Sequence, residues 1–424
     1  MVSYDAAVEI LQKKAVSLQS PNERDGKQIW EEVYLMDAVG RVAATEVVSP
    51  TATPQFDTHA MDGVRDDRCR RWAYGAGWMR FRGAVEPCLE IMTGRHLPQG
   101  CGHDEAVRRV RARRRHRRGI RCRYDGTDDH DHKAGAVGCE PQARRVRHPA
   151  RGADRQRGDV LSSSHIMPLA SVGVSKIRVF KKPRVAVWST GKALMAGEAS
   201  NIPDVNGPFL VAALREAGAQ PTFLGTLHDN EDAVMGALRD TIDGGLFGLV
   251  LTTGGVSVGK FDFVASSLGA LGAKTHFHGV AMRPGHPVLF AQVPGLSHDL
   301  PFFGLLGNAG ATAACFRFLV VPFLRSWQHQ TAETPIMAEC VEDTSTDSRE
   351  AASPGIPRMT SSRHGIMQQG KNGDVLVEFS KQQSPAKLGP FINANCWVRL
   401  GGQSQGSRRE GRVACFYMPV HATV

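Results

Sequence analysis

The segment PRVAVWSTG at residues 183–191 has the pattern of a buried strand that ends in a small polar turn. Two further strand patterns follow, PTFLGTL at 221–227 and GLVLTTGG at 248–255. A helical pattern precedes each of them: NGPFLVAALREAGA at 206–219 and NEDAVMGALRDTI at 230–242. Strands that alternate with helices at this spacing are typical of βαβ units on a parallel sheet. We therefore predict an α/β domain here, which ends near Arg325 after the apolar helix TAACFRFLVVPFL.

The two ends of the chain carry different patterns. Behind Ser3, a residue type that favours the N-cap position, apolar residues recur at helical spacing and predict an opening amphipathic helix: Val8, Leu11, Ala15 and Leu18. The stretch 328–363 is rich in Thr, Ser, Glu and Pro and indicates a linker or loops. Beyond it, GDVLVEFS, NCWVRL and RVACFYMPV are typical of short strands and predict a small all-β domain.

The composition favours a cytoplasmic, globular protein of several domains. At 424 residues the chain is about three times the roughly 150-residue length of a common domain. Its nine cysteines are odd in number and show no metal-ligand or redox spacing, which favours a reducing compartment. Asp5 and Glu9 stand where a signal peptide needs a basic flank, and glycines interrupt the most apolar stretch, 300–316. We therefore expect neither secretion nor a membrane span.

Most of the formal net charge of +10 comes from one segment. Residues 102–158 contain 17 Lys and Arg against 8 Asp and Glu, and their only large apolar side chains are Tyr124 and Ile120 besides valines. So few apolar groups cannot offset the entropy of ordering the backbone. Two interpretations stay open: residues 102–151 come from a shifted reading frame or a misassembled gene model, or they are a disordered basic insertion. Only this segment favours a nucleic-acid partner, and we expect no specific one.

A glycine-rich turn follows the apolar strand in GLVLTTGG. The run TTGGVSVG at 252–259 lies between that strand and the helical pattern FVASSLGALG. Glycines at such a junction let backbone N–H groups turn outward, and the next helix adds its positive dipole end, so the turn suits a phosphate. A purely structural turn is the alternative. The Ser-Thr-Gly run at 189–191 ends a strand of the same sheet, and ligands of open α/β sheets bind at that edge, which favours the functional interpretation.

Two further segments carry polar or charged groups. Asp204 and Asn206 lie just before the helix that starts near Pro208, where a carboxylate either caps the helix or holds Mg²⁺ against a ligand's oxygens. In the run RPGHP, Arg283 and His286 are candidates to neutralise an anion. A surface turn shaped by its prolines is the alternative for that run.

Taken in order, the motifs resemble those of the molybdopterin molybdenumtransferase family, which completes the molybdenum cofactor and includes the E domain of gephyrin. The matching segments span most of the chain: FDTHAMDG (56–63), IMTGRHLPQGC (91–101), RGAD (151–154), LASVG (169–173), PRVAVWSTG (183–191), IPDVN (202–206), TTGGVSVGKFD (252–262), RPGHP (283–287) and LLGNA (305–309). The AMDG and IMTG blocks and the GGVSVG turn are the most specific of them.

The resemblance implies a fold and an activity. The fold is α/β multidomain: a helical domain with an inserted small β domain, a three-layer α/β molybdopterin-binding domain and a C-terminal β-barrel. Their predicted bounds are, in that order, 1–55 plus 155–178, 56–154, 179–327 and 328–424. The family binds adenylylated molybdopterin, inserts molybdate at the dithiolene and releases AMP with Mg²⁺ assistance. A homodimer and an adenylyltransferase domain or protein partner are implied as well.

The resemblance also implies site residues by motif position. The catalytic polar and acidic groups would be Asp62, Thr93, Asp154, Asp204 and Asp262, and the metal ligands would be Asp204 and Asp262. The groups that bind the molybdopterin substrate would be Ser189, Thr190, Gly191, Asn206, Gly254, Gly255, Ser257, Gly259, Arg283, Pro284, Gly285, Gly307 and Asn308. In the dimer, the side with Asp62 would face the Asp204 side of the other subunit.

The chain departs from the family pattern at charged and rigid positions. Three positions that carry carboxylates in the family are Lys192, Ala193 and Lys260 in this chain. Two family lysines are replaced by Arg283 and His286, and two family prolines are replaced by Leu306 and Ala309. A lysine in place of a carboxylate inverts the local charge. Two main hypotheses follow: the chain is a molybdenum insertase, or it is a catalytically impaired relative that binds molybdopterin or acts as a scaffold.

Overall fold

The computed structural model describes residues 1–19, 29–46, 157–190, 203–227, 230–256, 263–295, 298–341, 358–381, 383–384, 386–401 and 412–418, with the backbone of five short strands between residues 63 and 91. The chain forms two compact units. The larger unit consists of Met1–Thr45, Gln156–Ile166 and Lys176–Val424, and the smaller of Glu46–Arg155 and Met167–Ser175. The division into four domains stays a prediction.

Helix α1 (Tyr4–Ser17) opens the chain, as predicted. Ser3 caps it, because the Ser3 hydroxyl oxygen accepts a hydrogen bond from the Ala6 N–H at 3.2 Å. One face of the helix is buried in the core of the larger unit, and it carries Tyr4, Ala7, Leu11 and Ala15.

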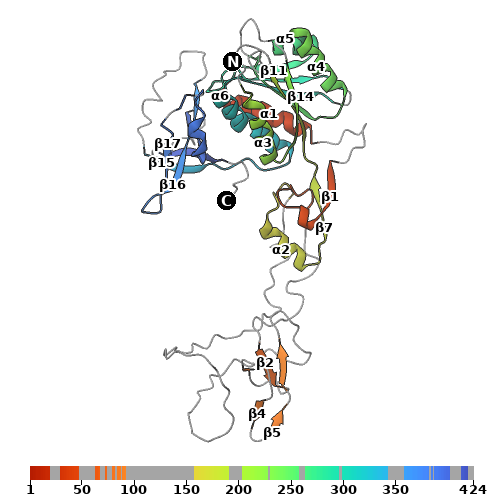
Figure 1. Ribbon diagram of the computed structural model, residues 1–424, viewed down its shortest axis with the longest axis vertical. Coiled ribbons are helices and arrows are strands. Elements are labelled where there is room, and N and C mark those ends of the chain that lie inside the picture. Colours follow the sequence, from red (N-terminus) through yellow and green to blue (C-terminus); the bar gives the residue numbers. More distant parts are fainter. Residues whose placement is uncertain are drawn as a thin grey trace. The chain divides into compact units, whose positions relative to one another are not determined.

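The core of the larger unit is a six-stranded mixed sheet (Figure 1). From edge to edge its strands are β11 (Lys274–His278), β13 (Leu289–Val293), β14 (Leu300–Leu305), β10 (Leu249–Thr253), β8 (Arg184–Thr190) and β9 (Gln220–Leu227). The last four are parallel, whereas β13 runs antiparallel to both β14 and β11. The predicted βαβ pattern is confirmed. Because β11 and β14 both run opposite to β13, β11 ends at the same edge as the four parallel strands.

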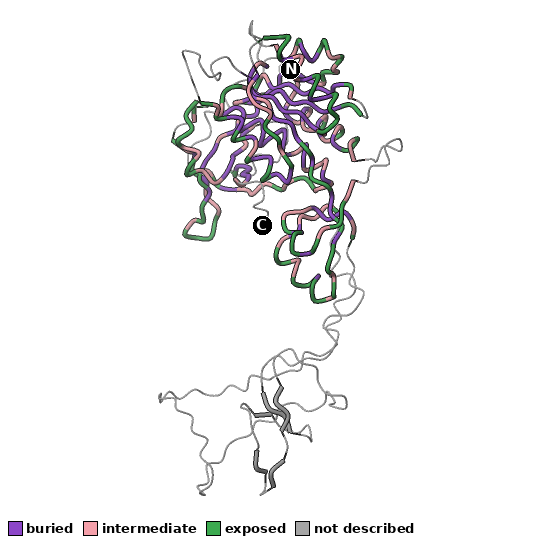
Figure 2. The backbone as a smooth tube through the Cα atoms, turned by 45° about the vertical axis from the view of Figure 1, so that its right-hand side comes forward, coloured by how far each residue is buried: buried purple, intermediate pink, exposed green. Residues whose placement is uncertain are grey.

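Helices cover both faces of this sheet. With α1 on one face lie α3 (Asn206–Glu216), α6 (Ala309–Cys315), the π-helical turn η3 (Phe316–Val320) and α7 (Val321–Trp327); on the other lie α4 (Glu231–Asp243) and α5 (Phe263–Ala270). Alternate strand residues pack accordingly: Val185 and Val187 toward the first face, Ala186 toward the second. Figure 2 shows the sheet deeply buried between these layers. The predicted three-layer architecture is confirmed.

The apolar stretch 300–316 is divided between β14 and α6. The continuous helix Ala309–Trp327 is apolar and long enough to cross a membrane by length and composition, but 78% of its most apolar window is buried inside the fold. A helix buried to this extent is a core helix of the α/β layer.

The C-terminal part of the larger unit is a closed barrel of five strands. In order around the barrel they are β16 (Thr360–Gln369), β17 (Val375–Phe379), β15 (Ile336–Cys340), β19 (Arg412–Tyr417) and β18 (Cys396–Gly401), which pairs back with β16; β12 (Met282–Arg283) joins β16 from outside. The predicted β-barrel is confirmed. The prediction that 328–363 forms only a linker or loops is wrong, because β15 and the start of β16 fall there. The buried residues that begin β16 include polar Thr360, Ser362 and His364, so the strand lacks an apolar signal.

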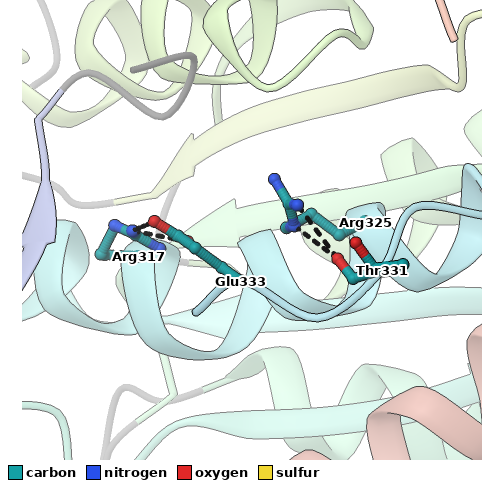
Figure 3. Close-up of polar contacts among 4 residues, drawn as sticks. All are labelled: Arg317, Arg325, Thr331 and Glu333. Carbon is teal, nitrogen blue, oxygen red and sulfur yellow. Dashed lines mark hydrogen bonds and ion pairs between the residues drawn. The ribbon is translucent and has the colours of Figure 1, made fainter. Parts of the chain in front are cut away.

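Two arginines of the core helix hold the chain that leads to the barrel (Figure 3). Arg317 is buried, and its Nη2 donates to both carboxylate oxygens of Glu333 at 2.6 and 2.7 Å. Arg325 donates from Nε and Nη2 to the carbonyl oxygen of Thr331 at 3.1 and 3.0 Å. The Arg317 guanidinium also lies 5.1 Å from the centre of the Phe416 ring in β19. These contacts fix the barrel against the α/β layer.

Shorter elements complete both units. In the larger unit, β1 (Trp30–Tyr34) pairs antiparallel with β7 (Lys176–Phe180), the 3₁₀ turn η1 (Leu35–Asp37) follows β1, and η5 (Gly389–Ile392) precedes β18. Helix α2 spans Ser163–Ser171. In the smaller unit, β2 (Gly63–Asp66) pairs with β3 (Trp72–Ala73) and β6 (Cys88–Ile91), and β4 (Met79–Phe81) pairs with β5 (Ala84–Glu86). These antiparallel pairs lie within the segment predicted to be an inserted β domain.

Candidate functional site

Four loops of the larger unit leave the central sheet at one edge, where β8, β10, β14 and β11 end. We call these loops, together with the start of α3, the carboxyl edge. Thr253 of β10 pairs in register with Ser189 of β8 on one side and with Leu305 of β14 on the other. Ser189 and Thr190 therefore end a strand next to the one that ends in the Thr-Thr-Gly-Gly turn, which confirms the prediction that the two motifs share an edge.

Asp204 holds the first turn of α3. Its Oδ1 accepts hydrogen bonds from the backbone N–H groups of Asn206 and Gly207, each at 3.0 Å. Its Oδ2 accepts one from Ser189 Oγ at 2.6 Å. The Asp204 carboxylate thus caps the helix and also joins α3 to the end of β8. A carboxylate has about four lone-pair positions, so three hydrogen bonds leave about one for a further ligand.

Asn206 joins three elements of the carboxyl edge. Its Nδ2 donates to Thr253 Oγ1 at 2.9 Å and to the Gly307 carbonyl oxygen at 2.7 Å. Thr253 Oγ1 in turn donates to the Leu306 carbonyl oxygen at 2.8 Å. Among the described residues, nothing donates a hydrogen bond to the buried Asn206 Oδ1. An unpaired buried acceptor costs about 1–3 kcal/mol, so this oxygen favours a donor from a bound molecule.

The glycine turn after β10 packs directly against Thr190. Gly254 has φ +89° and Gly255 has φ +65°, in the region that side chains disfavour. A Cβ atom on Gly254 would lie 2.6 Å from both the carbonyl oxygen and Oγ1 of Thr190. The Gly254 N–H donates to the Leu305 carbonyl oxygen at 2.9 Å. Only glycine therefore permits this close approach of the β8 and β10 loops.

The loop that contains RPGHP follows β11 at the same edge. Gly285 has φ +117°, and a Cβ there would lie 2.5 Å from Cys315 Sγ at the end of α6. Burial raises the pKa of the Cys315 thiol, so it stays protonated and donates to the Gly285 carbonyl oxygen at 3.5 Å. His278 Nε2 lies 2.8 Å from the carbonyl oxygen of Val256, which joins the end of β11 to the glycine turn. Arg283 is exposed in this loop.

The structure places more than half of the predicted site residues on the carboxyl edge. They are Ser189, Thr190, Asp204, Asn206, Gly254, Gly255, Arg283, Pro284, Gly285, Gly307 and Asn308. Outside the described residues lie Asp62, Thr93, Asp154, Gly191, Ser257, Gly259 and Asp262, together with Lys192, Ala193 and Lys260, so their roles stay predictions. Within the described ranges, no three His, Cys, Asp or Glu side chains group closely enough to hold a metal ion by themselves.

Sequence reasoning missed three residues that organise this edge. Thr253 both accepts from Asn206 and donates to Leu306, as given above. Thr312 Oγ1 of α6 donates to the Asn308 carbonyl oxygen at 3.1 Å. The role of His278 could not be predicted, because a single histidine at the end of a strand belongs to no recognisable motif. Thr253 and Thr312 carried a weak signal, since hydroxyl residues at a strand end or in a first helical turn often bond nearby backbone.

Comparison with known proteins gives consistent matches over both halves of the chain. Residues 2–173 match the family described as the MoeA N-terminal region (domain I and II), and residues 186–326 match the probable molybdopterin binding domain. A protein of Bacillus subtilis named molybdopterin molybdenumtransferase is 28% identical over 91% of this chain and 88% of its own length. A Nostoc protein of the same name is 30% identical over 71% of this chain and 70% of its own length.

Solved structures share the fold. A molybdopterin biosynthesis MoeA protein of Pyrococcus horikoshii superposes with a TM-score of 0.60 at 21% identity, over 98% of this chain and 99% of the other. A molybdenum cofactor biosynthesis protein of Pyrococcus furiosus has a TM-score of 0.53 at 17% identity, over 98% of each chain.

Proposed function

Because this chain belongs to the molybdopterin molybdenumtransferase family, we propose that it is a molybdenum insertase, which converts adenylylated molybdopterin and molybdate to molybdenum cofactor and releases AMP. The observation that carries the proposal is the Asn206 junction, where one buried amide joins α3, the end of β10 and the loop after β14. Such a junction fixes three loops in one geometry around a ligand. The similarity to transferases disfavours the alternative of a catalytically impaired scaffold.

In this proposal the carboxyl edge binds the phosphate-bearing pterin. The glycine turn at Gly254 and Gly255 brings backbone close to the ligand, since neither residue carries a side chain of its own. Asn206 Oδ1, unpaired among the described residues, accepts a hydrogen bond from the substrate. Arg283, Pro284 and Gly285 add a cationic loop, and Gly307 and Asn308 close the other side. In a homodimer, Asp62, Thr93 and Asp154 would complete the site of the other subunit, in the catalytic roles predicted for them.

We include Mg²⁺ in the proposal, with Asp204 and Asp262 as its protein ligands. The fit rests on Asp204, because its carboxylate keeps about one lone pair after its three hydrogen bonds. Mg²⁺ in proteins commonly takes one or two carboxylates together with substrate phosphate oxygens and water. The ion would neutralise phosphate charge, while Ser189 keeps Asp204 oriented through its 2.6 Å hydrogen bond. Calorimetric titration of Mg²⁺ into the substrate complex should show binding that Asp204→Asn weakens.

The cellular setting follows from the same proposal. A biosynthetic enzyme that consumes a soluble pterin works in the cytoplasm. Its adenylylated substrate must come from an adenylyltransferase, which is either another domain of a larger protein or a separate partner. The basic segment that favours nucleic acid lies almost entirely outside the described residues, and no part of this proposal depends on it.

The direct test is molybdate-dependent release of AMP from bound adenylylated molybdopterin, measured with the full chain. We expect AMP release to increase with molybdate, and Asn206→Leu to reduce it strongly. Asn395→Leu is the matched control, because the Asn395 side chain also makes two hydrogen bonds, both with the backbone of Met367 in the barrel, at 2.7 and 2.8 Å. Restoration of a molybdoenzyme activity in cells that lack the insertase gives an independent readout. AMP release without dependence on molybdate would contradict the proposal.

A further inference from the structure

A cavity of about 480 Å³ lies at the opposite edge of the central sheet, where β8 and β10 begin. We call it the amino-edge cavity. Its wall includes three cationic residues within four positions, Lys181, Lys182 and Arg184, and the rings of Phe180, Phe247 and Trp327. A volume of this size falls within the range of about 300–1,000 Å³ that is typical of small-molecule sites. None of the predicted site residues of the carboxyl edge lines it.

The charge of the cavity favours an anion. None of its described lining residues is Asp or Glu, and no described carboxylate forms an ion pair with Lys181, Lys182 or Arg184. The ends of α1 and α7 reach the same cavity through Ser17 and Trp327, and each helix C-terminus contributes roughly half a negative charge. Three full cations exceed these two partial charges, so the net potential stays positive. Backbone hydrogen bonds from Lys181 to Ile29 and from Gly248 to Arg184 hold the cationic run in place at 3.0 and 2.9 Å.

The walls of the cavity are flat and aromatic. The His329 ring stacks on Phe180 with a centroid distance of 4.1 Å and an interplanar angle of 15°. His329 has φ +61°, a conformation that costs a side-chain-bearing residue about 1–2 kcal/mol, so the fold holds the ring there against strain. Across the wall, the Arg184 guanidinium lies 5.9 Å from the centre of the Phe247 ring. Burial and the nearby Arg157 cation lower the pKa of His329 to about 4, so this ring is neutral at pH 7.

We propose that the amino-edge cavity is a second ligand site, separate from the carboxyl edge, for a planar heterocycle that carries a phosphate, of the size of a nucleoside monophosphate. The rings of Phe247 and Trp327 contact the heterocycle, the buried Phe180 supports the His329 ring behind them, and Lys181, Lys182 and Arg184 hold the phosphate. Rings that stack and cations that bind phosphate are the two elements that recognise nucleotides. The opposing interpretation is that the cations only neutralise the helix C-termini, in which case no ligand is bound.

The test uses the full chain with AMP as the probe, and adenosine and inorganic phosphate as its separate halves. Hydrogen-exchange mass spectrometry should show that AMP protects segments 181–184 and 245–248, in addition to any protection at the carboxyl edge. We expect Lys181→Ala with Lys182→Ala to weaken AMP binding at the amino edge by about tenfold, and Phe247→Leu to weaken it while keeping apolar volume. Lys371→Ala with Lys381→Ala, two exposed lysines of the barrel, is the matched charge control and should change nothing.

The outcomes separate this site from the proposed function. Protection confined to the carboxyl edge, or no AMP binding at all, would overturn the second site without touching the insertase assay. Tight binding of phosphate alone, unaffected by Phe247→Leu, would also overturn it, since the cavity would then be only a cationic surface. Loss of AMP release with the amino-edge protection intact would overturn the proposed function and leave this site standing.

Discussion

The two edges of the central sheet differ in how their polar groups are satisfied. At the carboxyl edge, side chains bond to one another and to loop backbone: Asp204 to Ser189, and Asn206 to Thr253 and Gly307. At the amino edge, Lys181, Lys182 and Arg184 line an open cavity, and none of them forms an ion pair with a described carboxylate. The first edge is a set of loops fixed by internal hydrogen bonds, and the second is a cationic surface with aromatic walls. Sequence motifs mark only the first, because its glycines and small polar residues are required by geometry.

The largest effect should come from breaking the close approach at the carboxyl edge. Gly254→Val would place a Cβ 2.6 Å from Thr190 and force a β-branched residue into positive φ. We expect a loss of about 3 kcal/mol or more in the free energy of unfolding, from clash and backbone strain together. Urea denaturation measures it. Gly236→Ala is the control, because Gly236 lies inside α4 with nothing near its Cβ, and it should stabilise by about 0.5–1 kcal/mol. Equal stability of the two variants would show that the turn is not constrained.

The next effect concerns the hydrogen bonds that hold the loops together. Asn206→Leu removes two donors and leaves the Gly307 carbonyl and Thr253 hydroxyl without that partner. We expect about 2–3 kcal/mol of destabilisation, since buried polar groups would lose their bonds. Asn395→Leu, which removes two bonds at a half-buried site in the barrel, should cost less. Thermal melts of both variants test the order, and a larger loss in the barrel variant would contradict it.

A third prediction concerns the charge next to the Ser-Thr-Gly motif of the carboxyl edge. Lys192 and Ala193 follow the Ser-Thr-Gly turn and lie outside the described residues. A lysine there holds phosphate oxygens but cannot coordinate Mg²⁺. Lys192→Asp with Ala193→Glu should therefore raise molybdate-dependent AMP release by about tenfold, which corresponds to about 1.4 kcal/mol in the barrier. Unchanged or lower release would mean that the family's acidic pair is dispensable in this chain.

The smallest effect lies at the amino edge and depends on pH. The pKa of His329 is about 4 in the folded chain, lowered by burial and by Arg157, against about 6.5 in the unfolded chain. Between these values the unfolded chain binds a proton that the folded chain does not, so stability falls as the pH drops from about 6.5 toward 4. His329→Asn keeps a residue that tolerates positive φ and should reduce this loss. Urea midpoints at pH 7 and pH 5 measure it, and an unchanged difference between them would exclude His329 as a contributor.

The parts of the fold that follow local patterns could be predicted. Alternating strands and helices gave β8, α3, β9, α4 and β10, and the cap at Ser3 marked α1. The start of β16 could not be predicted, because Thr360, Ser362 and His364 are buried where a strand normally shows apolar residues. Those polar side chains face the layer between the barrel and the α/β core. The residues on the other side of that layer are distant in the chain, so a short stretch of sequence around β16 does not reveal the burial. The site was found through motif order, but its organising residue Thr253 was not.

What the sequence alone determined is the order of the elements, the α/β class and the positions of the glycines, because periodicity and backbone strain act over a few residues. Only the tertiary structure decided which loops meet. Asn206 and Gly307 are 101 residues apart in the chain, and a hydrogen bond of 2.7 Å joins them. Because β13 runs antiparallel to β11 and β14, the RPGHP loop lies at the carboxyl edge. The ends of α1 and α7 line the cavity at the other edge. Contacts of this kind depend on how distant segments pack, and packing is a property of the folded chain.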